Sequence, residues 1–284
     1  MQMFLRIVSL MALASLVLTT TARADGGDRR GGHPSLEGPI FDITHFDVLP
    51  LVPPQVADDF QQVGYGALFK YRDASQSDRG LESFRVVNWL LAANHSQIID
   101  VWSSLEAFEQ HLAQPHSVDF RFAVQIQPPP APPGINCCIG SPIDDRQYSL
   151  VKSFGTPWTS TSLPSTVGAN SALFVITYTD FLQEVLEQDP DAGQNQLVEY
   201  GATSIKANSG QLLSYTVLQQ LDRPNRYVFL EVWDTTANYI AWQGSATTTD
   251  FIDQTMPLLG SPFDHRLNIL CGDTFVDGTG CVPP

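Results

Sequence analysis

Hydrophobic and polar positions follow the same order twice along the chain. Each half begins with an alternating or apolar run typical of a strand, continues with a helix, two strands and a second helix, and closes with a strand. In the first half these elements are predicted at 40–49, about 54–70, 82–92, 96–102, from Ser103 and Ser104 onward, and at 146–152. In the second half they are predicted at 172–181, 181–188 with a continuation near 195–206, 211–221, 226–233, from Asp234 and Thr235 onward, and at 266–271.

The two halves also match residue by residue. The offset between them is 131 to 135 residues over most of the chain and 120 at the last matched block. We therefore predict a tandem duplication, with repeat 1 at 41–152, a linker at 153–171 and repeat 2 at 172–271. A Pro-rich insertion at 127–138 explains the change in offset. The matched pairs include Phe41 with Phe174, Tyr65 with Tyr200, Asn88 with Gln219, Asp100 with Glu231, Trp102 with Trp233, and Arg146 with Arg266.

The order βαββαβ in each repeat is that of the ferredoxin-like fold, so the predicted class is α+β. Such a sheet is covered by its helices on one face and needs burial on the other. We expect the two repeats to bury these faces against each other as an intramolecular dimeric α+β barrel. The pairs Ser103-Ser104 and Asp234-Thr235 offer N-caps where each second helix would begin.

The first 24 residues carry the parts of a secretory signal peptide. Arg6 precedes an apolar run from Ile7 to Leu18, and Ala22-Arg-Ala24 provides a small-residue cleavage pattern. The run is shorter than the roughly 20 residues that a spanning helix needs. We expect cleavage after Ala24, a flexible mature N-terminus at 25–40, and an exported protein, periplasmic or secreted, with no membrane attachment after cleavage.

Export changes the interpretation of the four cysteines. An even number in an oxidising compartment favours disulfides, and adjacent cysteines rarely bond each other. We expect both members of the adjacent pair to cross to the two C-terminal cysteines, in an order that the sequence leaves open, and no metal site among them. The candidates are Cys137, Cys138, Cys271 and Cys281, the last in the tail at 272–284.

The acidic balance limits the partners. The formal net charge is −15 at pH 7, and a surface of this kind repels nucleic acid and anionic lipid. A small neutral or cationic ligand, or a basic partner, is favoured instead. The chain also contains no phosphate-binding glycine loop and no hydrolase nucleophile motif.

The stretch from Ile99 to His116 resembles the antibiotic-biosynthesis-monooxygenase family. In that family an acidic residue and an aromatic residue end a strand, as Asp100 and Trp102 do here, and a helix with two histidines, here His111 and His116, follows. The resemblance implies a dimeric α+β barrel, usually built from two chains, and covers most of both repeats. It also implies oxidation of quinols or polyketide aromatics without a cofactor, although some members degrade haem and many have no assigned reaction.

The resemblance makes repeat 1 the better candidate for chemistry. Repeat 2 has Trp242 and Thr247 where repeat 1 has His111 and His116. The haem-degrading branch would need a histidine at Ile252, so haem binding is the weakest option. A histidine titrates near neutral pH and can deprotonate a quinol to an anion that reduces oxygen. We therefore take His111 and His116 as catalytic candidates, against the alternative that both are structural.

Other polar and aromatic residues are candidates for binding a flat substrate. Each has a structural alternative: core packing for the tryptophans, and a protein hydrogen-bond partner for the amides. The recurring pairs of Asp144 with Arg146 and Asp264 with Arg266 are interpreted as structural. The binding candidates are Trp102, Trp233, Asn88, Gln219, Tyr65 and Arg85, with Tyr71 as a further residue of repeat 1.

Two functions from different classes remain open. The first is an exported monooxygenase-like enzyme that oxidises a small aromatic or quinol substrate with O₂ and needs neither a metal nor another cofactor. The second is a non-catalytic exported protein that binds a small hydrophobic ligand, which the loss of the histidines from repeat 2 favours. In either case the partner is a small aromatic or hydrophobic molecule, and the chain is a monomer or a homodimer.

Overall fold

Eight antiparallel strands close into a barrel in the order β1-β3-β2-β8-β5-β7-β6-β4. This closed strand order confirms the predicted intramolecular α+β barrel. The computed structural model describes residues 38–47, 70–91, 95–125, 144–165 and 172–273. The strands are β1 (Ile40–Asp47), β2 (Leu81–Trp89), β3 (His95–Trp102), β4 (Asp144–Gly155), β5 (Leu173–Asp180), β6 (Leu212–Gln220), β7 (Arg226–Trp233) and β8 (Asp264–Asp273).

Each repeat supplies a four-stranded sheet, β4-β1-β3-β2 in repeat 1 and β8-β5-β7-β6 in repeat 2. The sheets join edge to edge where β4 pairs with β6 and β2 pairs with β8. These joins lengthen the last strand of each repeat beyond the sequence prediction. The end of β4 continues to Gly155 because it pairs with Ser214 of the other repeat.

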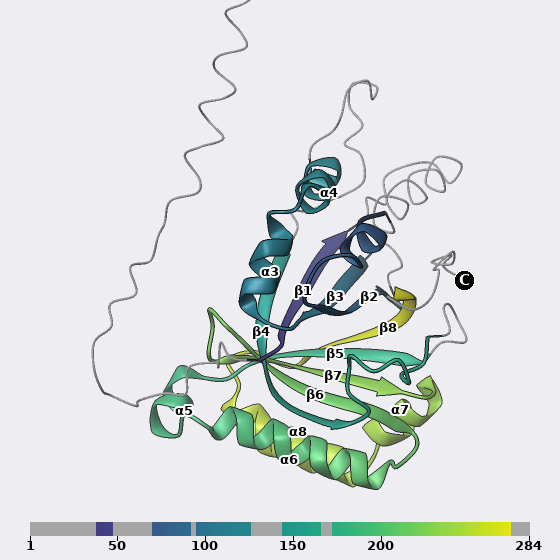
Figure 1. Cartoon of the computed structure of the whole chain (residues 1–284). Coiled ribbons are helices and arrows are strands. Elements are labelled where there is room, and N and C mark those ends of the chain that lie inside the picture. Colours follow the sequence, from purple (N-terminus) through teal and green to yellow (C-terminus); the bar gives the residue numbers. More distant parts are fainter. Residues whose placement is uncertain (1–37, 48–69, 92–94, 126–143, 166–171, 274–284) are drawn as a thin grey trace, which may run out of the picture. The chain divides into compact units, whose positions relative to one another are not determined.

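Helices cover the outer side of the strands (Figure 1). Each predicted pair supplies the N-cap through its second residue, Ser104 or Thr235, whose side chain accepts a hydrogen bond from a backbone N–H of the first helical turn. Residues 70–75 are also helical, whereas the rest of the helix predicted at about 54–70 lies outside the described residues. The helices are α3 (Leu105–Leu112), α4 (Pro115–Gln125), α5 (Gln183–Gln188), α6 (Ala192–Ala207), α7 (Thr236–Gln243), α8 (Ala246–Thr255) and the 3₁₀ turn η1 (Met256–Leu258).

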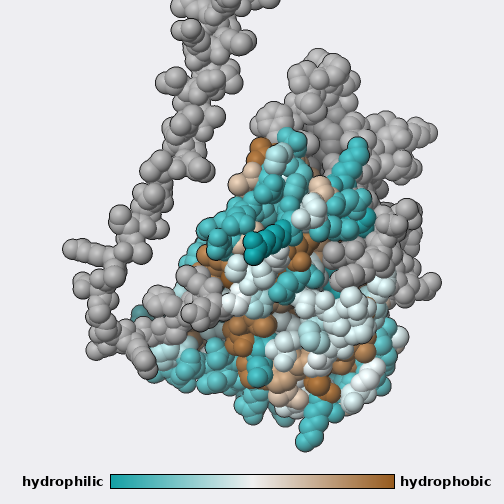
Figure 2. All heavy atoms as spheres, in the orientation of Figure 1, coloured by the Kyte–Doolittle hydropathy of each residue, from teal (hydrophilic) through white to brown (hydrophobic). Residues whose placement is uncertain are grey.

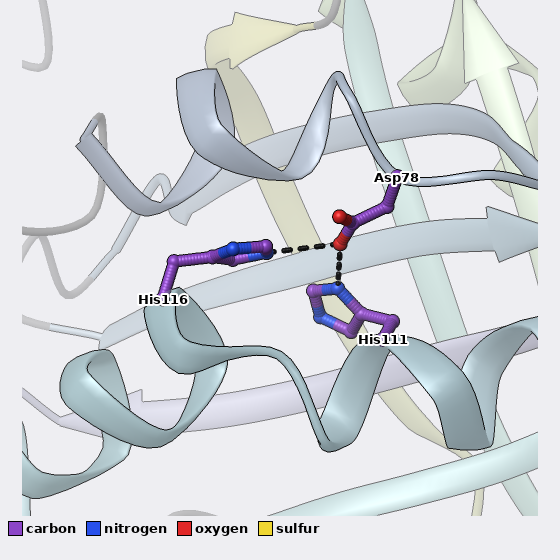
Figure 3. A group of neighbouring side chains, drawn as sticks. All are labelled: Asp78, His111 and His116. Carbon is purple, nitrogen blue, oxygen red and sulfur yellow. Dashed lines mark hydrogen bonds and ion pairs between the residues drawn. The ribbon is translucent and has the colours of Figure 1, made fainter.

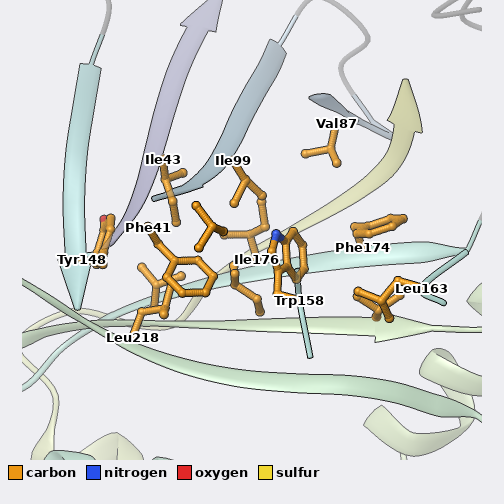
Figure 4. Close-up of a cluster of buried hydrophobic side chains, with 14 of the residues drawn as sticks. Phe41, Ile43, Val87, Ile99, Tyr148, Trp158, Leu163, Phe174, Ile176 and Leu218 are labelled. Carbon is orange, nitrogen blue, oxygen red and sulfur yellow. The ribbon is translucent and has the colours of Figure 1, made fainter. Parts of the chain in front are cut away.

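The inside of the barrel is a packed apolar core, because alternate side chains along each strand point inward. Phe41 and Ile43 of β1 meet Phe174 and Ile176 of β5 there (Figure 4). The segment that the sequence assigns to the linker also enters this core. Its Trp158 is 2% exposed and its ring meets Phe174 edge-on at 5.7 Å between centroids.

The outward-facing side chains pack against the helices in two separate clusters. In repeat 2 a large aromatic cluster includes Tyr215 and Trp233. In repeat 1 a smaller one contains Ile40, Trp102 and Phe108. In the view of Figure 2, polar side chains cover most of the described surface and apolar ones show in patches. Within the described ranges, no helix combines the length and the apolar character that crossing a membrane requires.

Several sequence predictions fall outside the described residues. They are the signal peptide at 1–24, most of the N-terminal segment 25–40, the insertion at 127–138, most of the tail at 272–284, and the residues Tyr65, Cys137, Cys138 and Cys281. Cys271, which is 1% exposed, is disulfide-bonded. The predicted pairing of the four cysteines stays a prediction.

Candidate functional site

Two histidines and an aspartate meet beneath the helices of repeat 1 (Figure 3). His111 Nδ1 lies 2.6 Å from Asp78 Oδ2, and His116 Nε2 lies 2.9 Å from the same oxygen. The other ring nitrogen of His111, Nε2, lies 2.5 Å from the Tyr71 hydroxyl. The sequence paired the two histidines as catalytic candidates, and the structure brings them together around a carboxylate.

The break between α3 and α4 sets the spacing of the histidines. His111 lies in the last turn of α3 and His116 in the first turn of α4, so both rings turn toward the same side. Asp78 comes from the turn that follows the helix at 70–75. Gly80 completes this turn with φ +93°, and a Cβ there would lie 2.6 Å from the Cβ of Ala107 in α3. Only glycine lets the turn approach α3 this closely.

The hydrogen-bond roles around His111 follow from its partners. A carboxylate accepts hydrogen bonds, so Nδ1 donates to Asp78 and, in the neutral ring, Nε2 accepts from the Tyr71 hydroxyl. The ring is held in place by Trp102, whose centroid is 4.4 Å away. Tyr71 in turn stacks on Phe120 at 4.3 Å. His111 is 1% exposed, so its ring is shielded from water.

A buried acidic pair lies on the same outer side of the sheet. Asp42 on β1 faces Asp100 on β3, and both are nearly inaccessible to solvent. Burial raises the pKa of Asp100 well above its ordinary value, and the neighbouring Asp42 carboxyl raises it further. The Trp102 indole N–H donates to Asp100 at 2.9 Å, which opposes the shift.

Repeat 2 has the same scaffold without the histidines. Tyr200 stacks on Phe251 at 3.9 Å, as Tyr71 does on Phe120. Its hydroxyl accepts a hydrogen bond from the Trp242 indole at 2.9 Å. Tryptophan is only a donor, so repeat 2 offers no base at the position of His111. The two halves are chemically unequal.

This comparison corrects one alignment made from the sequence. Tyr200 was matched with Tyr65, but Tyr71 makes the contacts that Tyr200 makes. Ser75 donates to the backbone carbonyl of Tyr71 at 2.7 Å, and Ser204 donates to that of Tyr200 at 2.7 Å. The sequence Tyr-Gly-Ala occurs at both Tyr65 and Tyr200, and this local identity led to the wrong match. The equivalent tyrosines are those that stack on a phenylalanine of the second helix, Tyr71 on Phe120 and Tyr200 on Phe251.

The predicted amides are held by the protein itself. The Asn88 side-chain carbonyl accepts from Ser96 at 2.6 Å, and Gln219 donates to the Tyr227 hydroxyl at 2.9 Å and to a backbone carbonyl. The contact of Asn88 joins β2 to β3, and the contact of Gln219 with Tyr227 joins β6 to β7. Both amides are buried, on the outer side of the sheet.

Arg85 does not join the histidines. It is 0% exposed and lies inside the barrel, where its guanidinium stands 5.5 Å from the Trp158 ring centroid and donates to the carbonyl of Ser160 at 3.2 Å. Arg85 lies on the same face of β2 as Val87, and this face points into the barrel. The sequence pattern did not reveal which face of the strand points inward. Trp102 and Trp233 are both fully buried against the helices, Trp102 beside His111 and Trp233 in the aromatic cluster of repeat 2.

A separate cavity of about 520 Å³ lies at one end of the barrel. The Asp–Arg contacts predicted from the sequence are confirmed there, since Arg146 pairs with Asp144 and Arg266 pairs with Asp264. His45 lies between them and accepts from Arg266 at its Nδ1, so its Nε2–H donates to the hydroxyl of Tyr178. Burial, aided by the positive charge of Arg266, lowers the pKa of His45 to about 3.

Sequence reasoning missed Asp78. Its position in a polar turn between a helix and a strand gives no local sign of a partner 33 residues away. The repeat offered one signal: Gly80 and Gly210 close equivalent turns with φ +93° and +84°, which aligns Asp78 with Asn208. Repeat 1 has a carboxylate, Asp78, where repeat 2 has an amide, Asn208. As with His111 and Trp242, a group that can take up a proton in repeat 1 is replaced by one that cannot in repeat 2.

The comparisons with known proteins agree with this fold. Residues 195–254, from α6 to α8 of repeat 2, match the family model of antibiotic biosynthesis monooxygenases. No curated protein sequence matches the chain. The resemblance to that family, made from the sequence, is confirmed.

Solved structures share the architecture of the chain. A proposed monooxygenase from Fusobacterium nucleatum subsp. nucleatum ATCC 25586 superimposes with a TM-score of 0.60 at 12% identity, over 87% of this chain and 97% of that one. An anthrone oxidase-like protein gives 0.57 at 13% identity, over 84% and 94%. A proposed monooxygenase from Lactobacillus acidophilus NCFM gives 0.54 at 15% identity, over 82% and 94%. Identities this low show a shared fold, not a shared reaction.

Proposed function

We propose that this monooxygenase-like chain oxidises a small aromatic or quinol substrate with O₂, using repeat 1 alone. The observation that carries the proposal is the buried hydrogen-bond chain from Asp78 through His111 to Tyr71. Repeat 2 keeps the tyrosine but replaces the base by Trp242. A duplicated fold that retains an imidazole, its orienting carboxylate and a phenol in one copy has the parts for acid–base chemistry there.

In the proposed reaction, His111 acts as the general base. Asp78 fixes the ring so that Nε2 is the accepting nitrogen, and Tyr71 donates to it. A hydroxyl that donates one hydrogen bond can also accept one from a phenolic substrate. The substrate proton thus passes to Tyr71 while the Tyr71 proton passes to His111 Nε2, and the charged imidazole is stabilised by Asp78.

The electrons come from the substrate itself. Deprotonation gives an electron-rich anion that reduces O₂ directly, one oxygen atom entering the substrate and the other leaving as water. The chain's residues bind the substrate, take up its proton and shield the anion from solvent. In this form the reaction requires neither flavin nor metal. The proposal extends to an exported protein on the strength of the N-terminal pattern at residues 1–24.

Oxygen uptake by the purified mature chain, measured with a panel of quinols and polyphenols, tests the proposal. We expect substrate-dependent uptake above autoxidation, reduced about 10²- to 10⁴-fold in His111→Ala, which is the usual contribution of a positioned base. Tyr71→Phe keeps the stacking on Phe120 and removes only the hydroxyl, so it should also lose rate without unfolding. Trp242→Phe, the matched change in repeat 2, should leave uptake unchanged.

Two results would overturn the proposal. Uptake that survives in His111→Ala would remove the base from the mechanism. No uptake across the panel, together with thermal stabilisation by the same compounds, would instead favour the non-catalytic binding protein, which the absence of a base in repeat 2 already makes the second candidate.

A further inference from the structure

Asp78 and the two histidines beside it also have the donor atoms of a metal site. One oxygen and two nitrogens, Asp78 Oδ2 and one ring nitrogen each of His111 and His116, all lie within 4.8 Å of one another. Two histidines and a carboxylate are a ligand set that divalent transition metals favour, whereas Ca²⁺ and Mg²⁺ prefer oxygen alone. No other such group occurs in the parts of the chain that the structure describes.

The contacts around the cluster are those that orient metal ligands. A ligating histidine usually has its second nitrogen fixed by a hydrogen bond, and Tyr71 makes this contact to His111. Trp102 lies against the same ring. The His111 side chain is fully buried, while those of Asp78 and His116 are 11% and 22% exposed, which gives an ion a route from solvent.

The spacing is close to that of a bound ion. Zinc bonds to nitrogen and oxygen are about 2.0–2.2 Å long, so tetrahedral ligands stand about 3.4 Å apart. The observed separations from Asp78 Oδ2 are 2.6 and 2.9 Å. These two separations would therefore lengthen by roughly 0.8 and 0.5 Å on binding, with water as a fourth ligand.

Repeat 2 provides a built-in comparison. The residues at the positions of Asp78, His111 and His116 are Asn208, Trp242 and Thr247. All three ligands are thus absent together from a scaffold that keeps the tyrosine and the aromatic stack.

We propose that Asp78, His111 and His116 bind one divalent transition-metal ion, for which Zn²⁺ is the probe. Binding replaces the hydrogen on His111 Nδ1 by the ion, so the neutral ring carries its hydrogen on Nε2. The hydrogen bond to Tyr71 then reverses, and Nε2 donates instead of accepting. A metal-bound chain cannot use His111 as a base, so the ion holds the site inactive.

Metal binding is independent of the proposed function, and only its inhibitory effect rests on it. Calorimetric titration of the untagged, chelator-treated mature chain with Zn²⁺ should show one ion per chain. His116→Ala should weaken binding at least about tenfold, because even removing a partner of a ligand costs that much. His95→Ala, at the far cavity, is the matched control and should bind as the wild type does.

The outcomes separate the two proposals. Equal Zn²⁺ affinity in the wild type and His116→Ala, or no one-to-one binding, would overturn the metal site. In an uptake assay, Zn²⁺ should suppress a working oxidase and a chelator should restore it. Tight binding to a chain that oxidises no substrate would leave the metal site standing and overturn the oxidase, whereas uptake that is unaffected by saturating Zn²⁺ would overturn the inhibition.

Discussion

Glu231 should make the protein less stable as the pH rises from acid to neutral. Its side chain is buried on β7, at 1% exposure, and contributes to the raised pKa values of the neighbouring Tyr200, Tyr215 and Tyr239. Burial raises the pKa of Glu231 from 4.5 to about 8. At neutral pH the folded chain therefore keeps a proton that the unfolded chain releases.

The size of the effect follows from this difference. Between the two pKa values, each pH unit removes about 1.4 kcal/mol from the free energy of unfolding. The contribution is fully present below pH 4.5 and is lost as the pH rises to 8. At pH 7 the accumulated loss is about 3 kcal/mol, a large part of the 5–15 kcal/mol that stabilises a typical domain.

The substitution Glu231→Gln removes the titration and keeps the shape. Chemical denaturation of the wild type and the variant at several pH values gives the difference in free energy of unfolding. This difference should shift in favour of the variant by about 3 kcal/mol between pH 4.5 and pH 7, whatever constant offset the amide introduces. Glu199→Gln, at an exposed position on α6, should give a difference that does not change with pH. A flat difference for Glu231→Gln would refute the reasoning.

Three further changes test the fold. Gly80→Ala should lower the melting temperature more than Gly210→Ala does, because both glycines have positive φ but only a Cβ at Gly80 would collide with the Cβ of Ala107. Equal losses of melting temperature would contradict this close contact. Trp158→Ala should lower the free energy of unfolding by about 3–5 kcal/mol in denaturant titration, and an unchanged midpoint would mean that this segment does not fill the core. His45 has a folded pKa of about 3, so its stabilising effect is present above pH 6.5 and lost as the pH falls to 3; His45→Gln should flatten that loss, and an unaltered acid limb would argue against it.

Local patterns in the sequence were enough for the repeats and their elements. The apolar runs in 40–49 and 172–181 reflect strands whose two faces are both buried, one inside the barrel and one beneath the helices. The N-caps at Ser104 and Thr235 satisfy backbone groups within one helical turn. Both are short-range effects. The duplication was equally visible, because matched blocks keep their order and spacing.

The candidate site was only half predictable. The family resemblance singled out His111 and His116, but Asp78 and Tyr71 reach them from a separate helix and turn. Arg85 was a binding candidate from the sequence, and the structure places it inside the barrel, beside the ring of Trp158. Sequence separation hid the contacts of Asp78 and Tyr71, whereas the face of β2 that turns into the barrel decided the position of Arg85.

The sequence by itself determined two βαββαβ repeats, their unequal histidines and the acidic charge, because each depends on residue identity and short-range order. The tertiary structure decided how β4 and β8 close the barrel, which strand face holds Arg85, and which carboxylate orients His111. These depend on contacts between segments 30 or more residues apart. Such contacts form only because closing the barrel buries enough apolar surface to offset the entropy of ordering the chain.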